Sequence, residues 1–285
     1  MTSLTIGKKT FTLGKRPLVM GILNLTPDSF ADGGRYASVE QAVNHALAME
    51  QQGADLIDIG GESTRPGAMK VSTDEEMKRV IPVIRELVDK VTIPLSIDTY
   101  NADVAMKALD LGVAMVNDIT ALQGDTKLVN IVAEYDVPVC LMHMKGNPRD
   151  MQKHPTYTDV VREIRSFLKE RADYALFHDI KKENIIVDPG LGFGKRTGRG
   201  IEDNCEILRR LSELKTLGYP LMVGASRKTF IGSVCGGEKP LPVSERLEGS
   251  LAAASMAVLN GADILRVHDV KETRRVVDFM TCIRG

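Results

Sequence analysis

Eight short apolar segments recur along this chain, and they restrict its fold more than any other feature of the sequence. Most are apolar throughout, without alternating polar residues, which is typical of parallel strands covered on both faces. They span residues 18–23, 56–59, 95–97, 114–116, 139–142, 185–187, 221–223 and 264–267.

Amphipathic helical patterns lie between these segments. Capping boxes can start at Ser38 and Thr73, and Asn101 is placed to cap a third helix. Apolar stripes of helical period follow each start, and glycines such as Gly53 and Gly112 end two of them. The predicted helices span residues 38–52, 73–87, 102–111, 157–175, 203–217, 246–260 and 273–283.

Strands that alternate with helices predict a parallel sheet with right-handed crossovers. This sheet can be an open doubly wound sheet or a closed barrel. The count of eight favours closure, as do the polar residues at nearly every strand end, because in a barrel these ends converge on one mouth. We therefore predict an α/β fold, a (β/α)8 TIM barrel, as a single domain over residues 1–285. Residues 1–16 form a short N-terminal β-hairpin and residues 17–285 form the barrel.

The charge balance and cysteine pattern exclude several classes of partner and site. The chain has 37 Lys and Arg against 38 Asp and Glu, so no bulk attraction favours nucleic acid or an anionic membrane. It contains neither an apolar run of about 18 residues nor the order of a signal peptide. Four well-separated cysteines fit neither a zinc site nor a disulfide framework. We expect a cytoplasmic protein with free thiols.

A polar residue follows nearly every predicted strand. Taken singly, each fits a helix N-cap or turn residue, and we adopt this interpretation for Asp58 and Asp118. The whole set also contains Arg, Lys and His, which caps do not require. The set consists of Asn24, Glu62, Ser63, Thr64, Arg65, Asp98, Asn117, Asp188, His143, Ser226, Arg227, Lys228, Arg266 and His268, with Asp118.

Three of these residues, Asp98, Asn117 and Asp188, combine two carboxylates with an amide. Such a group can chelate a metal, act as an acid–base pair, or bind a flat heterocycle with adjacent N–H donors, such as an aminopyrimidine. A histidine-rich metal centre is disfavoured, because no His-Glu-x-x-His motif is present and His143 is the lone histidine of its strand end.

Cationic residues follow the last two strands, where barrels usually bind phosphate. Lys228 comes just after the seventh strand, and Arg266 and His268 end the eighth. We predict that Lys228 and Arg266 are functional and that Arg227 is a solvated charge. Where the backbone turns at the end of the last strand, Arg266 and His268 can both reach one anion. The glycines of residues 190–195 lack the spacing of a P-loop or dinucleotide motif. They predict a loop passing close to a flat ligand, with Phe193 as its lid or stacking face.

Seven motifs in family order make the chain resemble dihydropteroate synthase over essentially its whole length. They are 21–30 (GILNLTPDSF), 58–67 (DIGGESTRPG), 96–99 (SIDT), 117–118 (ND), 188–195 (DPGLGFGK), 224–228 (GASRK) and 266–270 (RVHDV). The resemblance implies a TIM barrel, usually a homodimer, in folate biosynthesis. The implied reaction joins (7,8-dihydropterin-6-yl)methyl diphosphate to 4-aminobenzoate and gives 7,8-dihydropteroate and diphosphate. Mg²⁺-assisted C–O cleavage through a carbocation-like state needs no protein nucleophile.

The resemblance also implies roles for individual residues. Lys228, Arg65, Asp28 and Asp98 would be catalytic. The pterin would be bound by Asp98, Asn117, Asp188 and Lys228, with Met142, Phe193 and Gly224 around its ring. The 4-aminobenzoate pocket, which sulfonamides occupy, would consist of Thr64, Arg65, Pro66, Ser226 and Phe30. The diphosphate would be bound by Asn24, Thr64, Arg266 and His268, and Asn24 would also ligate Mg²⁺. The dimer would form through residues 252–259 and 273–283.

Other functions remain open at this point. A methyltetrahydrofolate–corrinoid methyltransferase would share the pterin-binding Asp and Asn, but it needs no diphosphate site. A Schiff-base barrel using Lys228 and a non-catalytic pterin-binding barrel are further alternatives. Residues 196–201 make the loop after Lys195 longer than the family pattern, which leaves the position of Phe193 undetermined.

Overall fold

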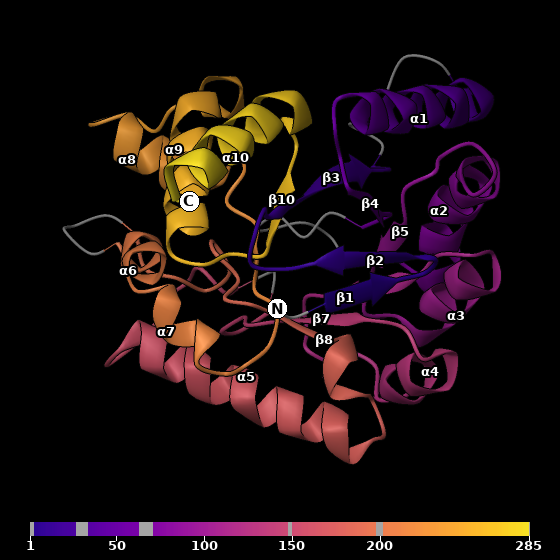
Figure 1. Ribbon diagram of the computed structural model, residues 1–285, viewed down its shortest axis with the longest axis horizontal. Helices are drawn as coiled ribbons and strands as arrows, with labels where there is room; N and C mark the ends of the chain where they lie inside the picture. The colour runs from indigo at the N-terminus through magenta and orange to yellow at the C-terminus, as the bar shows by residue number, and fades with distance from the viewer. Residues whose placement is uncertain (1–2, 27–33, 63–70, 148–149, 198–201, 285) are drawn as a thin grey trace.

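The computed structural model describes residues 3–26, 34–62, 71–147, 150–197 and 202–284, without the side chains of 34–38. Figure 1 shows helices arranged as a ring around a central group of strands. The helices of this ring are α1 (Gly34–Gln51), α2 (Thr73–Leu87), α3 (Ala102–Asp110), α4 (Leu128–Tyr135), α5 (Val160–Phe177), α6 (Asp203–Arg209), α7 (Ser212–Lys215), α8 (Thr229–Cys235), α9 (Leu247–Leu259) and α10 (Val270–Arg284). Two 3₁₀ turns, η2 (Lys182–Asn184) and η3 (Val243–Glu245), complete the described helical structure.

The sheet has eight parallel strands in the order β8-β7-β6-β5-β4-β3-β10-β9. An isolated parallel bridge between Val187 and Leu221 joins the two outer strands and closes the ring. This confirms the predicted TIM barrel. The strands are β3 (Leu18–Asn24), β4 (Leu56–Gly60), β5 (Leu95–Asp98), β6 (Met115–Asp118), β7 (Val139–Met142), β8 (Ile185–Asp188), β9 (Met222–Val223) and β10 (Ile264–Val267).

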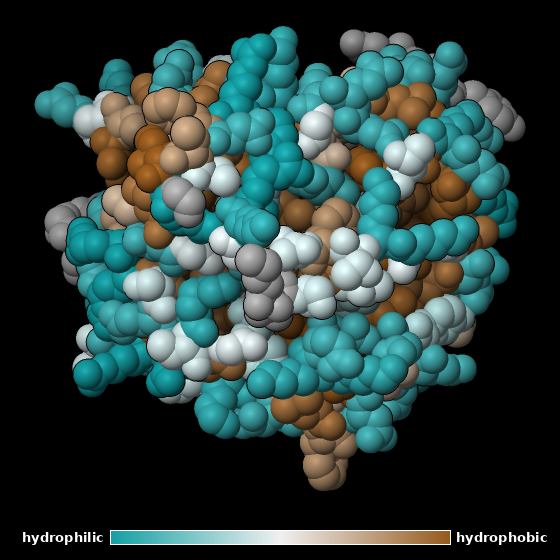
Figure 2. Space-filling view, in the orientation of Figure 1, coloured by the Kyte–Doolittle hydropathy of each residue, from teal (hydrophilic) through white to brown (hydrophobic). Residues whose placement is uncertain are grey.

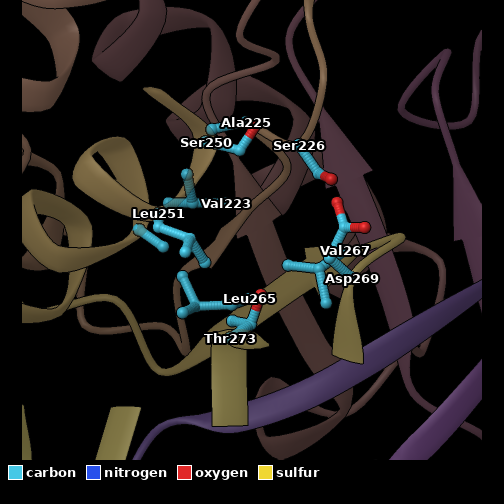
Figure 3. Close-up of a pocket in the computed structure, with 10 residues that line it drawn as sticks. Val223, Ala225, Ser226, Ser250, Leu251, Leu265, Val267, Asp269 and Thr273 are labelled. Carbon is cyan, nitrogen blue, oxygen red and sulfur yellow. The ribbon is translucent and has the colours of Figure 1, made fainter. Parts of the chain in front are cut away.

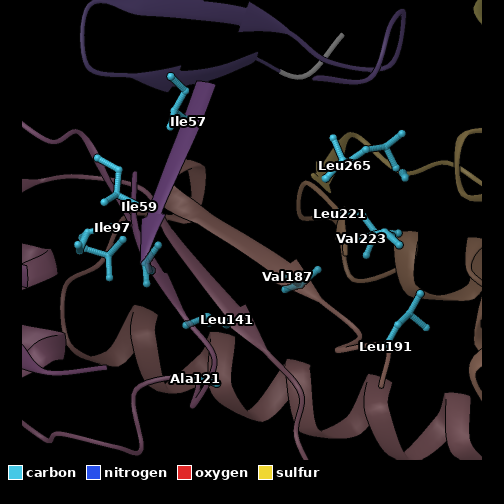
Figure 4. Close-up of a cluster of buried hydrophobic side chains, with 14 of the residues drawn as sticks. Ile57, Ile59, Ile97, Ala121, Leu141, Val187, Leu191, Leu221, Val223 and Leu265 are labelled. Carbon is cyan, nitrogen blue, oxygen red and sulfur yellow. The ribbon is translucent and has the colours of Figure 1, made fainter. Parts of the chain in front are cut away.

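The closed sheet separates two apolar layers because successive side chains of a strand point to opposite faces. Outward side chains, such as Ile59, Leu141 and Val187, pack under the helices (Figure 4). The alternate residues of each strand face the barrel interior. Near the amino ends of all strands except β5, whose inward residue there is Ser96, they are apolar and form a second, separate cluster, which contains Met20, Leu56, Met115, Cys140, Ile186, Met222 and Ile264.

The predicted N-terminal hairpin closes this apolar end of the barrel. Strands β1 (Ser3–Ile6) and β2 (Lys9–Thr12) pair antiparallel and lie across the barrel in front of the strand ends (Figure 1). Leu4 and Ile6 are fully buried in the interior cluster. The hairpin therefore acts as a plug, and the opposite end is left for ligands. In the described parts of the chain, no helix is both long and apolar enough to cross a membrane.

Replacing Ile6 with Ala should reduce the free energy of unfolding by about 2–5 kcal/mol, because it leaves a cavity between the hairpin and the barrel interior. Denaturant unfolding monitored by circular dichroism measures this change. Thr5→Ala, at an exposed position of the same strand, is the matched control and should change stability little. A loss below about 1 kcal/mol in Ile6→Ala would show that the hairpin is not an integral part of the core.

Candidate active site

The inward residues at the carboxyl ends of the strands are polar and line one large cavity. Its volume is about 1130 Å³. A second cavity, shown in Figure 3 between β9, β10 and the start of α9, has only about 10 Å³ and is too small for more than a water molecule. The large cavity brings together eleven predicted site residues: Asn24, Asp98, Asn117, Met142, Asp188, Phe193, Gly224, Ser226, Lys228, Arg266 and His268.

Arg266 connects three strands at the base of this cavity. Its Nε donates to Asp58 Oδ2 and its Nη2 to Asp98 Oδ2, both over 2.6 Å. Asn117 Nδ2 donates to the same Oδ2 of Asp58 over 2.8 Å. The guanidinium, predicted to meet an anion, is thus already bound to two carboxylates in the described structure. Its own position and that of Asn117 both depend on Asp58.

Asp58 is a site residue that the sequence analysis missed. We interpreted it as a cap or turn residue, which is wrong: it lies inside β4, is fully buried and faces the barrel interior. Its position two residues after the inward Leu56 is the signal that could have shown this. Asp118 does have the predicted turn role, since its carboxylate accepts from Thr120 and Leu122.

The two predicted carboxylates have raised pKa values. Burial raises the pKa of Asp98 to about 7, although Arg266 opposes the shift. Burial also raises the pKa of Asp188 to about 6, against the hydrogen bond from Gly190 N and the attraction of Lys228. Both carboxyl groups therefore change protonation close to neutral pH, which is common among residues at functional sites.

The loop after β9 is held against the end of β10. Arg227 forms a bidentate pair with Asp269 over 2.9 and 2.5 Å, so its prediction as a solvated charge is wrong. The sequence around Arg227 gives no local sign of this ion pair, because Asp269 lies 42 residues further along the chain. Ser226 Oγ lies 3.1 Å from His268 Nδ1. Burial and Arg266 lower the pKa of His268 to about 4, so in this state it is a neutral hydrogen-bonding group.

Phe193 forms a buried wall of the cavity. It is 6% exposed, and Lys228 Nζ lies 4.1 Å from its ring centroid. The predicted passage of this loop close to a flat ligand stays a prediction; at Gly190 the loop passes close to the protein backbone, since φ is 66° and an added Cβ would lie 2.0 Å from His143 O. After Lys195, Arg196 donates to both carboxylate oxygens of Asp203 and so links the two ends of the loop that follows.

Comparisons with known proteins identify this arrangement. Residues 20–268 match the model of a family described as pterin binding enzyme. A dihydropteroate synthase of Synechocystis sp. is 46% identical over 273 residues, which cover 96% of this chain and 92% of that protein. A Xanthomonas albilineans dihydropteroate synthase solved with 4-aminobenzoic acid has a TM-score of 0.91 and 44% identity, covering 100% of this chain and 98% of that chain. A Yersinia pestis dihydropteroate synthase in a sulfonamide drug complex has a TM-score of 0.91 and 42% identity, covering 99% of both chains.

The chain belongs to the dihydropteroate synthase family. The resemblance found in the sequence is thereby confirmed. Five residues to which the family resemblance assigns roles lie outside the described residues, and their predicted roles stay predictions: Asp28, Phe30, Thr64, Arg65 and Pro66.

The described residues fit a metal ion only if a ligand shares it. No group of three or more His, Cys, Asp or Glu side chains that could hold an ion occurs among them. Asn24 lines the cavity at the end of β3. Beside it Gly60 lacks a side chain, and Asn24 Oδ1 and Asp98 Oδ2 both lie 3.6 Å from where a Cβ would be. Mg²⁺ often takes one or two protein oxygens and completes its shell with phosphate and water, which this donor set allows.

Replacing Asp188 with Asn should stabilise the protein at pH 8. Folding raises the Asp188 pKa from 3.8 to about 6, so the folded state binds more protons between these values and stability falls as pH rises through that window. The shift corresponds to at most about 3 kcal/mol. Asn keeps an oxygen that can accept from Gly190 N without the charge.

Chemical denaturation at pH 8 and pH 5 measures this difference. The stabilisation by Asp188→Asn should shrink at pH 5, where most of the wild-type carboxyl group is protonated. Asp89→Asn, at an exposed position, is the control and should show no such pH-dependent gain. An Asp188→Asn variant no more stable than wild type at pH 8 would contradict the raised pKa.

Proposed function

We propose that this chain condenses (7,8-dihydropterin-6-yl)methyl diphosphate with 4-aminobenzoate to give 7,8-dihydropteroate and diphosphate. It is then a transferase of folate biosynthesis. The observation that carries the proposal is the joint placement of Asp98, Asn117, Asp188, Lys228 and Arg266 around one cavity, in a chain of the dihydropteroate synthase family.

The acceptors of the cavity suit the aminopyrimidine edge of a pterin. Asp188 and Asn117 present oxygen atoms to its N–H groups, and a carboxylate can accept two parallel N–H bonds from such an edge. Lys228 supplies a donor to the oxygen and nitrogen acceptors of the same ring. Met142 and Phe193 provide apolar surface for the ring faces, and Gly224 leaves room for close approach.

The diphosphate end of the substrate suits the other half of the cavity. Asn24, Arg266 and His268 would hold this anion, together with Thr64. When bound, Mg²⁺ on Asn24 would supply positive charge that stabilises the leaving diphosphate. Arg266 would assist with N–H donors other than the two that it gives to Asp58 and Asp98. Stabilising the leaving group in this preorganised way requires no protein nucleophile.

The chemistry is a substitution at the exocyclic methylene carbon. The C–O bond breaks, and the diphosphate leaves with the electron pair while the electron-rich pterin stabilises the carbocation-like carbon. The nitrogen of 4-aminobenzoate then forms the new C–N bond and releases a proton. Asp98, which lines the same cavity, would stabilise the developing positive charge when ionised. Ser226 would contact 4-aminobenzoate beside Thr64, Arg65, Pro66 and Phe30, with Asp28 nearby, in a pocket that also accepts sulfonamides.

Diphosphate release from the purified protein, given the pterin diphosphate and Mg²⁺, tests this function. We expect release that depends on 4-aminobenzoate and yields dihydropteroate. Tight pterin binding without any release would instead support the non-catalytic barrel. Methyl transfer from methyltetrahydrofolate to a corrinoid would support the methyltransferase.

Replacing Lys228 with Ala should lower kcat/KM by about 10²-fold or more, because one preorganised contact to the reacting ligand is lost. Steady-state kinetics measure the loss, and circular dichroism checks that the protein stays folded. Lys271→Ala, on the outer helix α10, is the control and should keep normal kinetics. Near-normal kinetics in a folded Lys228→Ala protein would refute the role of this residue.

We further propose that the protein is a cytoplasmic homodimer. Support for the dimer comes from exposed apolar side chains on α8, α9 and α10, seen as the brown area at the upper left of Figure 2. Phe279 is 67% exposed, Ile283 58% and Leu259 47%. Exposed apolar patches of this kind often mark protein interfaces. Four free cysteines support a reducing compartment.

Phe279→Glu should convert the dimer to a monomer, because it places a charge at the most exposed apolar side chain of the patch. Light scattering should give twice 31.2 kDa for the wild type and the single mass for the variant. Phe177→Glu is the matched control, since Phe177 is 82% exposed on a different helix, α5, and the variant should remain dimeric. A monomeric wild type would refute the proposal.

A further inference from the structure

Lys195 is buried without a carboxylate partner among its hydrogen bonds. Its side chain is 1% exposed, which makes it the largest of the fully buried side chains described. Nζ donates to the carbonyl oxygens of Gly190 and Phe193, both over 2.8 Å, and lies 3.0 Å from His143 Nδ1 and 3.4 Å from His143 O. An ammonium group has three donors, so these four acceptors can occupy it completely.

The backbone around Lys195 is shaped to present those carbonyl groups. Gly190, Gly192 and Gly194 have φ values of 66°, 82° and 61°, which glycine adopts without strain. A Cβ at Gly194 would lie 2.2 Å from Lys145 O, so the loop packs directly on the segment that follows β7. Gly194 O also accepts from Tyr157 Oη over 2.6 Å. The loop is thus fixed to its neighbour through Lys195 and through its own backbone.

The same loop carries two residues that line the cavity, Asp188 and Phe193. Asp188 Oδ1 accepts from Gly190 N over 2.7 Å, and Gly190 O is an acceptor of Lys195. Phe193 O is another acceptor of Lys195, while the ring of Phe193 lies under Lys228 Nζ. A change in the orientation of either carbonyl group would therefore move a ligand-contacting side chain.

We propose that Lys195 is a positioning residue: its ammonium group organises the loop of residues 188–195 and thereby fixes Asp188 and Phe193 for pterin binding. This rests on the proposed function only for the identity of the ligand. Burial lowers the pKa of Lys195 to about 7, with Asp188 and Asp203 opposing the shift and Lys228 adding to it. His143 remains neutral and able to accept at Nδ1, since burial and the charge of Lys195 lower its pKa to about 2.

The test is Lys195→Met, which keeps the length of the side chain and removes all its donors. We expect the KM for the pterin diphosphate and the Kd for pteroic acid to rise about 10-fold to 100-fold, because small displacements of positioning groups have effects of this size. The KM for 4-aminobenzoate should change less than about 3-fold, because Ser226 lies on a different loop. Lys169→Met is the control: it lies on the outer helix α5, its amine bonds to Asp173 over 2.6 Å, and its constants should stay near those of the wild type.

A purely structural role predicts a different result. A Lys195→Met protein with a lower melting temperature but unchanged pterin constants would overturn the proposal. An equal loss for both substrates would overturn it too, since it indicates general loosening of the site. If Lys195→Met does not fold, His143→Phe removes one acceptor of the ammonium group and retains an aromatic ring against Phe167, which packs edge-on at 5.0 Å.

The same selective rise in the pterin constants, of smaller size, is expected for His143→Phe. Unchanged pterin constants in a folded His143→Phe protein would overturn the proposal. The binding of pteroic acid also separates this inference from the assigned reaction. If the wild type binds pteroic acid but releases no diphosphate, the proposed function fails, while the effect of Lys195 on pterin affinity is still decided by the binding measurement.

Discussion

Compensation of buried charge is the interaction on which the mouth of this barrel depends. Asp58 is completely buried, and with Asp98 it shares the guanidinium of Arg266. Removing one partner of such a group is strongly destabilising, by about 3–5 kcal/mol, because an unpaired charge remains in a region of low dielectric. The arrangement therefore fixes Asp98 and, through Asp58, also Asn117 before any ligand binds. The hydrogen-bond acceptors of Asp98 and Asn117 are therefore already in position when a ligand arrives.

Two features could be predicted from the local sequence pattern: the strands themselves, and the meeting of the polar side chains at their carboxyl ends. Each of the eight apolar segments became a strand with bounds shifted by at most two residues. Asp98, Asn117 and Asp188 meet because each ends a strand of a closed parallel sheet. Asp58 was misjudged because a carboxylate near a glycine pair fits a turn equally well. Only its register against Leu56 and the distant Arg266 distinguish the two interpretations.

Helices that lack their own end signals could not be found from the sequence. Helix α4 has eight residues, and its N-cap, Lys127, makes no side-chain cap bond, so it resembled an apolar loop. Helix α8 was missed for similar reasons. The single helix predicted over 203–217 is divided into α6 and α7, where Asn260 donates to Leu208 O over 2.7 Å. Asn260 directly follows α9, so the break coincides with a contact from outside the segment, and no residue of 203–217 signals it.

The loop after Lys195 begins at a point where a change in chain length leaves the site in place. Strand β8 turns Ile186 to the apolar plug and Asp188 to the cavity. A one-residue insertion within the strand would exchange its two faces, which would place the carboxylate under the helices. An insertion after Lys195 has no such effect. The ammonium group holds the loop on one side of the insertion, and Arg196 paired with Asp203 closes its base. The chain can therefore lengthen there while Phe193 stays buried against the ligand cavity.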